Sequence, residues 1–364
     1  MNKPVFIVGC PRSGTTFLYD MLLSSGKFAL YRAESDVFFR IAPAFGNLKS
    51  RSNRVRLVAA WLKSDYFRRS GLNGGELRDK VLSECRNPGD FLRIVMESVA
   101  RLQGVRRWAD NTPFHLLYIA EIKKTIPNAQ FVHILRDGRD VAMSLSRMGW
   151  PHCFPWDAKH RLAIPGLYWK WLVSQGRESG RKLGSDYLEL QYENLVGRPQ
   201  ETLATLSQFI GEDLNYADIQ ENAVGTVASP NSSFSYTGEL RSIGRWKSLP
   251  NVDSVQLSTL LSPLLQELGY QTGLSTKSNF AGSRLIGSYL PYWGLRKKIK
   301  RSPLSKFLVS REWLEPGALD RFDARFEAIR NGNNEVIISK RELSDAEEIW
   351  SGPEDSEAAN SDCF

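Results

Sequence analysis

A short segment near the start of the chain, FIVGCPRSGTT from Phe6 to Thr16, combines an apolar run, a loop between two glycines and the polar start of a helix. This is the frame of a phosphate-binding loop, G-x-x-x-x-G-K-[ST], which follows a buried parallel strand and opens a helix. Thr15 stands where that loop has its lysine, and a cation occurs earlier, at Arg12. Because the lysine serves the β- and γ-phosphates of a nucleoside triphosphate, the loop predicts an anion site whose ligand is neither ATP nor GTP.

Apolar runs and helical patterns alternate after this segment. The predicted strands are Val5–Val8, Phe131–Leu135 and Tyr187–Tyr192. The predicted helices are Thr15–Ser25, Pro113–Ile126 with Thr112 as its N-cap, Asp137–Arg147, Gly166–Leu183 and Pro199–Ile210. This alternation implies right-handed crossovers and a parallel sheet with helices on both faces. The predicted fold is α/β, a P-loop-like doubly wound parallel sheet with a mostly helical C-terminal extension, and its ligands should bind at the carboxyl ends of the strands.

Composition divides the chain into three parts. Residues 1–272 form the predicted α/β domain, 273–351 a C-terminal extension, and 352–364 an acidic tail that is predicted to be disordered. Within the first part, residues 213–238 are rich in Asn, Ser and Gly and are predicted to be a loop or lid. A linker is predicted over residues 272–283.

Net charge and composition limit the classes of partner. The chain of 364 residues has a net charge of +8, which favours an anionic partner, although a solvated basic surface would give the same value. No recognised motif for reading nucleic-acid sequence accompanies this charge. The 4 cysteines and 4 histidines show no metal-site or disulfide spacing, so a reducing compartment and no metal are expected. We expect a cytoplasmic protein, at most peripheral to a membrane, because no leader precedes the first strand and no apolar run reaches about 18 residues.

The loop has the chemistry of an anion cradle. Gly9 and Gly14 permit close backbone approach, and the N–H groups at the start of the following helix would point at an anion. Hydroxyl donors and one permanent cation accompany them, at Ser13, Thr15, Thr16 and Arg12. The alternative is a strand–turn–helix unit with ordinary polar capping.

A second constellation follows the strand that ends at Leu135. Arg136 ends this strand, and Ser144 lies eight residues further on, two turns into the next helix. Together they could bind a second phosphate. The alternative is surface salt bridging among the charged residues of this turn, which are Arg136, Asp137, Arg139 and Asp140.

A third constellation is the sequence GRWK, from Gly244 to Lys247. Arg245 and Lys247 supply positive charge, and Trp246 supplies an aromatic plane, which suits a phosphate and an adenine ring. Alone, the same residues could form a basic surface turn.

Taken together, these motifs resemble the PAPS-dependent sulfotransferase family, most closely its bacterial and tyrosylprotein branches. The resemblance covers about residues 4–270. It implies that the 5′-phosphosulfate loop consists of Pro11, Arg12, Ser13, Gly14, Thr15 and Thr16, and that Arg136 and Ser144 bind the 3′-phosphate. It also implies that Tyr192, in QYENLV, lies near the adenine and that Arg245, Trp246 and Lys247 close over the cofactor. The implied donor is 3′-phosphoadenosine 5′-phosphosulfate (PAPS), the product is PAP, and no metal is required.

The resemblance also suggests catalytic residues. Arg12 would stabilise the charge that develops on the leaving oxygen. Glu34 is the predicted general base for the acceptor hydroxyl or amine, with Asp36 and His152 as alternatives. Asn111 stands where many relatives have a lysine, and its amide can donate a hydrogen bond but carries no charge.

Other interpretations stay open from the sequence alone. A P-loop kinase or NTPase is disfavoured by Thr15, and a non-catalytic PAPS-binding protein remains an alternative because of Asn111. The basic segment 296–306 follows three aromatic residues, Tyr289, Tyr292 and Trp293, and together they could contact a membrane, dock an acidic acceptor or form a solvated helix. The acceptor class (glycan, lipid, peptide or small metabolite) and the oligomeric state are not determined by these patterns.

Overall fold

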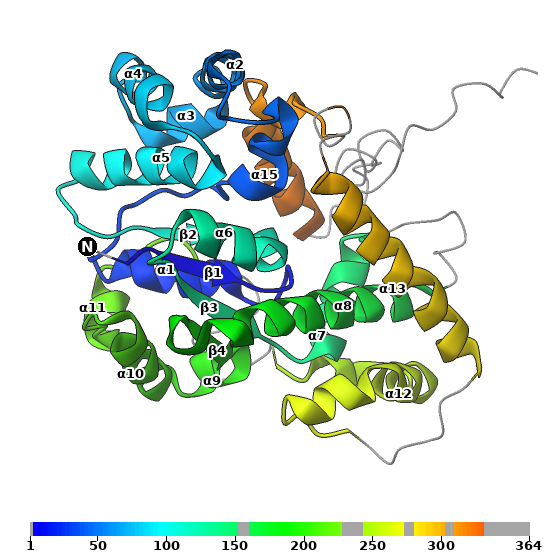
Figure 1. Ribbon diagram of the computed structural model, residues 1–364. Coiled ribbons are helices and arrows are strands. Elements are labelled where there is room, and N and C mark those ends of the chain that lie inside the picture. The colour runs from blue at the N-terminus through cyan, green and yellow to red at the C-terminus, as the bar shows by residue number, and fades with distance from the viewer. Residues whose placement is uncertain are drawn as a thin grey trace, which may run out of the picture.

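The computed structural model describes residues 3–151, 160–227, 243–272, 280–302, 307 and 309–330. Its centre is a parallel sheet of four strands in the order β2-β1-β3-β4 (Figure 1). The strands are β1 (Val5–Val8), β2 (Ala109–Asn111), β3 (Gln130–Leu135) and β4 (Tyr187–Gln191). Ile7 pairs with Asn111 on one side and with Val132 on the other, so the phosphate-binding loop leaves the sheet at its centre.

Helices cover both faces of the sheet, as the near-continuous apolar strands predict. Alternate residues of β1 belong to two different core clusters, with Phe6 on one face and Ile7 on the other. The helices are α1 (Thr15–Ser24), α2 (Arg51–Trp61), α3 (Asp65–Ser70), α4 (Gly74–Glu84), α5 (Pro88–Leu102), α6 (Ile119–Thr125), α7 (Gly138–Arg147), α8 (Ala163–Gly180), α9 (Tyr192–Gly197), α10 (Pro199–Ile210), α11 (Tyr216–Glu221), α12 (Asn251–Glu267), α13 (Phe280–Lys300) and α15 (Ala318–Arg330). The predicted doubly wound α/β fold is therefore confirmed.

Short irregular helices connect these elements. Within the described residues they comprise one π-helical turn, η1 (Val37–Ile41), and five 3₁₀ segments, η2 (Pro43–Phe45), η3 (Pro113–Tyr118), η5 (Arg181–Asp186), η6 (Arg245–Ser248) and η7 (Glu312–Leu314). One of them, η6, contains Arg245, Trp246 and Lys247 of the third constellation, and η1 begins directly after Asp36.

The structure differs from the predicted elements in four places. The helix predicted from Pro113 divides into η3 and α6, and the Thr112 hydroxyl accepts from the Ser35 N–H at 2.9 Å instead of capping it. Tyr192 opens α9 rather than ending β4. The predicted loop 213–238 contains α11, whose first turn is capped by Asn215, and residues 228–238 lie outside the described part. Within the predicted linker 272–283, helix α13 begins at Phe280.

The C-terminal extension packs on the α/β domain through α13, which crosses α8 in Figure 1. Tyr289 and Trp293 of α13 are buried, and Trp293 contacts the rings of Tyr168 and Trp171 on α8. The hypothesis that these aromatic residues insert into a membrane interface is therefore wrong for Tyr289 and Trp293, because packing consumes their apolar surface. The tail 352–364 lies outside the described residues.

The basic residues of α13 are also used within the molecule. Lys297 donates to Gln175 at 2.8 Å, and Arg301, just after the helix, pairs with Glu121 at 2.7 Å. Among the described residues, no helix is long and apolar enough to cross a bilayer.

Candidate active site

The phosphate-binding loop depends on two glycines that could not carry a side chain. A Cβ on Gly9 would lie 2.8 Å from the Ile134 carbonyl oxygen, because the loop passes close to β3. Gly14 has a φ of 96°, and a Cβ there would lie 2.3 Å from the Tyr192 ring. Arg12 is itself in the left-handed region, with a φ of 73°, where a residue other than glycine is uncommon. The loop is thus held in one conformation by contacts with β3 and α9.

Groups that bind anions converge inside this loop. Ser13 is fully buried, and within the described residues its Oγ has no hydrogen-bond partner. No described side chain caps the N-terminus of α1, and its first turn contains no acidic residue. Such an N-terminus attracts an anion through its N–H groups and the helix dipole. Thr15 is buried at the start of α1 and Thr16 is exposed. These residues therefore fit a phosphate or sulfate group.

The second constellation meets the first directly. The Arg12 Nε donates to the Ser144 Oγ at 3.0 Å, and the Arg136 Nη1 donates to the Arg12 carbonyl oxygen at 2.9 Å. The Arg136 guanidinium also lies 4.5 Å from the centre of the Tyr192 ring. The structure thus brings together all four of these predicted residues. One detail differs from the prediction. Arg12 belongs to the loop, but its side chain extends toward Ser144, at the predicted 3′-phosphate site.

The third constellation is fixed to the start of α7. The buried Asp140 carboxylate accepts from the Gly244 N–H at 2.7 Å and from the Trp246 N–H at 2.9 Å. The Arg139 guanidinium lies 3.5 Å from the Trp246 ring centre. Sequence reasoning missed this role of Asp140, since no local pattern links it to a residue 104 positions later.

The alternative of surface salt bridging in the turn after β3 is wrong. Arg139 is 2% exposed and forms a buried ion pair with Asp137 at 2.7 Å. The Asp137 side chain also caps α7 by accepting from the Arg139 N–H. Glu193, from the QYENLV motif, accepts from the Asp137 N–H at 2.9 Å and from the Tyr270 hydroxyl at 2.9 Å. These contacts fix the turn from which Arg136 projects.

Positive charge is concentrated where the three constellations meet. Partial burial lowers the pKa of Arg245, and the neighbouring charges of Arg147 and Arg136 lower it further. The guanidinium groups of Arg147 and Arg136 are therefore close enough to repel that of Arg245, and an anion placed among them would relieve that repulsion. Arg147 was not predicted as a site residue, while Lys247, which was, is exposed at the rim.

Residues 4–216, more than half of the chain, match the sulfotransferase family. The chain belongs to the sulfotransferase family. Protein-tyrosine sulfotransferase A of Caenorhabditis elegans is 23% identical over 299 residues, covering 73% of this chain and 67% of that protein. Protein-tyrosine sulfotransferase 1 of Danio rerio is 25% identical over 285 residues, covering 73% and 72%. The sulfotransferase domain of the Synechococcus PCC 7002 olefin synthase has a TM-score of 0.49 at 18% identity and covers 74% of this chain and 97% of that domain.

Membership of this family confirms the predicted enzyme class. The sulfotransferase transfers a sulfuryl group, and the family as a whole uses PAPS as donor and releases PAP. In the described part of the sulfotransferase, no group of three or more His, Cys, Asp and Glu side chains is arranged to hold a metal ion.

Glu34 lies at the same edge of the sheet as the loop. The following residue, Ser35, donates its N–H to Thr112 directly after β2, which places Glu34 at the carboxyl end of that strand. Glu34 is exposed to solvent, yet dense surrounding protein and, secondly, the charge of Asp36 raise the pKa of its carboxyl to about 8. An exposed carboxyl with a raised pKa suits a general base.

The two alternative bases fare differently. Asp36 is buried, and one of its oxygens, Oδ2, accepts from Arg40 and from the Tyr66 hydroxyl, both at 2.9 Å. These contacts make Asp36 part of the packing of η1 rather than a group that an acceptor can reach. His152 lies outside the described residues.

Asn111 ends β2, beside the end of β1 in the register of the sheet. It is 6% exposed, and its Oδ1 has no hydrogen-bond partner among the described residues. A buried amide without such a partner is costly in a packed interior and points to a position that meets a ligand. The neighbouring Asp110 is used differently, because its Oδ1 is 2.7 Å from the buried His115 Nδ1.

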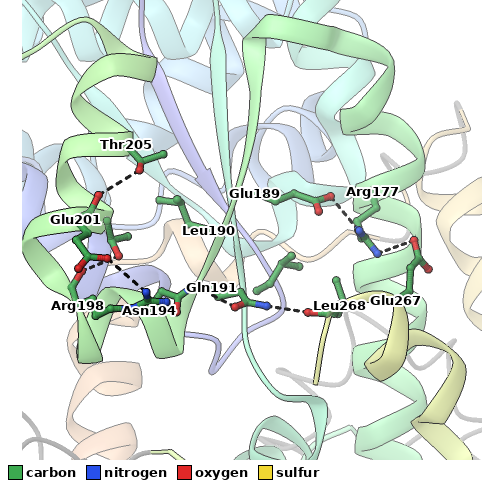
Figure 2. Close-up of a pocket in the computed structure, with 12 residues that line it drawn as sticks. Arg177, Glu189, Leu190, Gln191, Asn194, Arg198, Glu201, Thr205, Glu267 and Leu268 are labelled. Carbon is green, nitrogen blue, oxygen red and sulfur yellow. Dashed lines mark hydrogen bonds and ion pairs between the residues drawn. The ribbon is translucent and has the colours of Figure 1, made fainter. Parts of the chain in front are cut away.

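A cavity of about 430 Å³ lies elsewhere, along β4 (Figure 2). Its lining groups are largely paired with one another, including Arg177 with Glu189 at 2.9 Å and Gln191 with the Leu268 carbonyl at 2.8 Å. None of the predicted site residues lines it. This cavity is therefore separate from the candidate active site.

Proposed function

We propose that the sulfotransferase moves the sulfuryl group of PAPS to a phenolic hydroxyl of a peptide or protein. The observation that carries the donor assignment is the junction of the two anion sites through the Arg12–Ser144 hydrogen bond. A ligand with one anionic group at the loop and another beside Arg136 would occupy both sites at once. In this proposal the donor is held by the loop Pro11–Thr16, by Arg136, Ser144 and Tyr192, and by the closing residues Arg245, Trp246 and Lys247.

The donor supplies an electrophilic sulfuryl group and a phosphate leaving group. The acceptor oxygen forms a bond to sulfur as the bond from sulfur to the 5′-phosphate oxygen breaks, and the acceptor proton passes to Glu34. Backbone N–H groups at the start of α1, with the cation of Arg12, stabilise the charge left on the phosphate. Asn111, at the adjacent strand end, offers a neutral hydrogen-bond donor to the same region.

The pKa of Glu34 supports a phenolic acceptor. A general base is most effective when its pKa lies near the operating pH, and a tyrosine hydroxyl, with a pKa of about 10, is more acidic than an aliphatic hydroxyl. The raised pKa of Glu34 brings it closer to a neutral operating pH than an ordinary glutamate would be. The names of the two relatives described above, both protein-tyrosine sulfotransferases, agree with this acceptor class.

Two measurements test the proposal. Thermal shift with PAP, adenosine 5′-monophosphate and Mg·ATP should rank PAP first, because only PAP places a second phosphate beside Arg136 and Ser144. Sulfuryl transfer from ³⁵S-labelled PAPS should then proceed to a tyrosyl peptide and not to a matched phenylalanyl peptide, a hexose, an amino sugar or a long-chain alcohol. Stabilisation by Mg·ATP alone would refute the donor, and transfer to another member of the panel would refute the acceptor. Tight PAP binding without transfer to any member would instead indicate a binding protein.

A further inference from the structure

Residues of the C-terminal extension contact the segment that carries the predicted base, although they lie beyond the family match at residues 4–216. The Trp313 ring centre lies 3.9 Å from the Arg40 guanidinium. The Arg311 Nη2 donates to the Ala44 carbonyl oxygen at 3.0 Å, and the Lys300 Nζ lies 4.7 Å from the centre of the Phe39 ring. The extension therefore covers η1 and the residues that follow it.

A second set of contacts holds the same segment from α15. Arg69, on α3, pairs with Asp320 at 2.8 Å and with Asp323 at 2.7 Å, and its Nη1 donates to the Arg32 carbonyl oxygen at 3.5 Å. The N–H groups of Gly317 and Leu319 donate to the Asp65 carboxylate at 3.0 and 2.9 Å. Figure 1 shows α15 beside α3 at the upper part of the molecule. The segment on both sides of Glu34 is thus tied to the C-terminal helices.

Arg40 is the centre of this arrangement. Its Nη1 donates to Asp36 at 2.9 Å, and only 13% of its side chain is exposed because Trp313 covers it. Asp36 directly precedes η1 and lies two residues after Glu34, and its carbonyl oxygen accepts from the Arg40 N–H at 2.8 Å. Stacking on Trp313 therefore restrains the Arg40–Asp36 ion pair. This ion pair in turn restrains the backbone conformation of the residues beside Glu34.

We propose that residues 296–302 and 309–323 form the acceptor-side wall of the active site and that Trp313, by stacking on Arg40, is a positioning residue for Glu34. The role of Glu34 as base rests on the proposed function, but the positioning of its carboxyl does not depend on which acceptor is used. The residues of this wall lie after the matched region 4–216. An acceptor that approaches Glu34 would therefore contact a surface formed by the C-terminal extension.

The electrostatics agree with a shared site. Charged groups from three parts of the chain act on the Glu34 carboxyl: Asp36 and Arg40 at η1, then Asp110 on β2, then Asp323 on α15. Asp323 is the member that comes from the extension, and its negative charge favours the protonated form of Glu34. Removing that charge, or loosening the cover over Arg40 so that water screens the buried Asp36 carboxylate, should lower the pKa of Glu34.

The test is a direct titration of Glu34 in the full chain, which needs no acceptor. Protein labelled with ¹³C at glutamate carboxyls is titrated by NMR, and the Glu34 resonance is assigned as the one missing from Glu34→Gln. The midpoint should fall by about one pH unit in Trp313→Ala and by about half a unit in Asp323→Asn, and it should stay near the wild-type value in Trp313→Phe, which keeps an aromatic face. Leu295→Ala, at an exposed position of α13, is the matched control.

Two further measurements separate positioning from a merely structural role. PAP affinity should be unchanged in Trp313→Ala, because the extension contacts the acceptor side of the site. Turnover of the tyrosyl peptide should fall at least tenfold, because a misplaced Glu34 would lose part of the rate enhancement that a general base supplies. An unchanged Glu34 midpoint in both Trp313→Ala and Asp323→Asn would overturn the inference. Absence of sulfuryl transfer by the wild-type protein would refute the proposed function instead, and the titration would still decide the positioning of Glu34.

Discussion

Replacing Asp140 should weaken PAP binding more than any other change outside the anion sites. Its carboxylate holds the closing motif through two backbone N–H groups, at 2.7 and 2.9 Å, and is 2% exposed. A hydrogen bond to a charged group contributes about 1.5–3 kcal/mol. Burial raises the pKa of Asp140, which shows that its charged form is destabilised, so we use the lower end of this range for each hydrogen bond. Two such bonds then contribute about 3 kcal/mol, or about a hundredfold in affinity.

The assay is isothermal titration with PAP on a graded series. Asp140→Ala should raise the Kd about a hundredfold, and Asp140→Asn about tenfold, since an amide oxygen still accepts one neutral bond. Asp213→Asn, at an exposed position, is the matched control. If Asp140→Ala unfolds at the wild-type temperature and binds PAP within about twofold of wild type, the closing motif does not contribute to nucleotide binding as argued.

Three further predictions follow from the same structure. Gly14→Ala should reduce PAP affinity at least tenfold, because the new Cβ would lie 2.3 Å from the Tyr192 ring. Gly26 also has a left-handed backbone conformation but has open space around it, so Gly26→Ala should cost only about 1–2 kcal/mol of stability and leave PAP affinity unchanged. The rate of sulfuryl transfer should rise with pH up to about 8, since Glu34 must lose its proton to act as base. The rate of Glu34→Gln should not change with pH and should be about 10²–10⁴-fold lower. A wild-type rate that is constant between pH 6 and 9 would contradict this prediction. Burial lowers the pKa of His133 to about 3, so the stability that depends on its neutral form is complete above about pH 6.5 and is lost as pH falls toward 3. The unfolding temperature of His133→Gln should therefore fall less steeply than that of the wild type over this pH range. Equal slopes in the two proteins would count against this prediction.

Local patterns predicted the parts of the site that are local in sequence. The apolar strand, the glycine spacing and the hydroxyls of the loop lie within eleven residues, and the strand-end Arg136 and Ser144 follow from one strand and one helix. The parallel sheet then brings their strand ends to a common edge, because Val8 pairs with His133. The fold and the grouping of these candidate site residues at one edge of the sheet were therefore accessible from the sequence.

Contacts between distant segments were not accessible in this way. The sequence offers a surface charge cluster as the alternative for Asp140, and nothing in RDGRD indicates that its carboxylate meets Gly244. For Trp293 the sequence leaves a membrane contact, a docking site for an acidic acceptor and a solvated helix open, because an aromatic residue beside lysines gives the same pattern whether it faces lipid or a second helix. Burial decides both cases, and burial depends on the packing of the whole chain.

The link between Arg311 and Ala44 spans 267 positions of the chain, and it closes over the catalytic edge of the sheet. Contacts of such separation form late, because the loop they close must first be brought together. During synthesis the nucleotide loop and its strand emerge early, while the wall beside Glu34 must wait for the last tenth of the described chain. A nascent chain would thus be able to bind nucleotide before it could deprotonate an acceptor, so the order of synthesis itself would delay the onset of sulfuryl transfer.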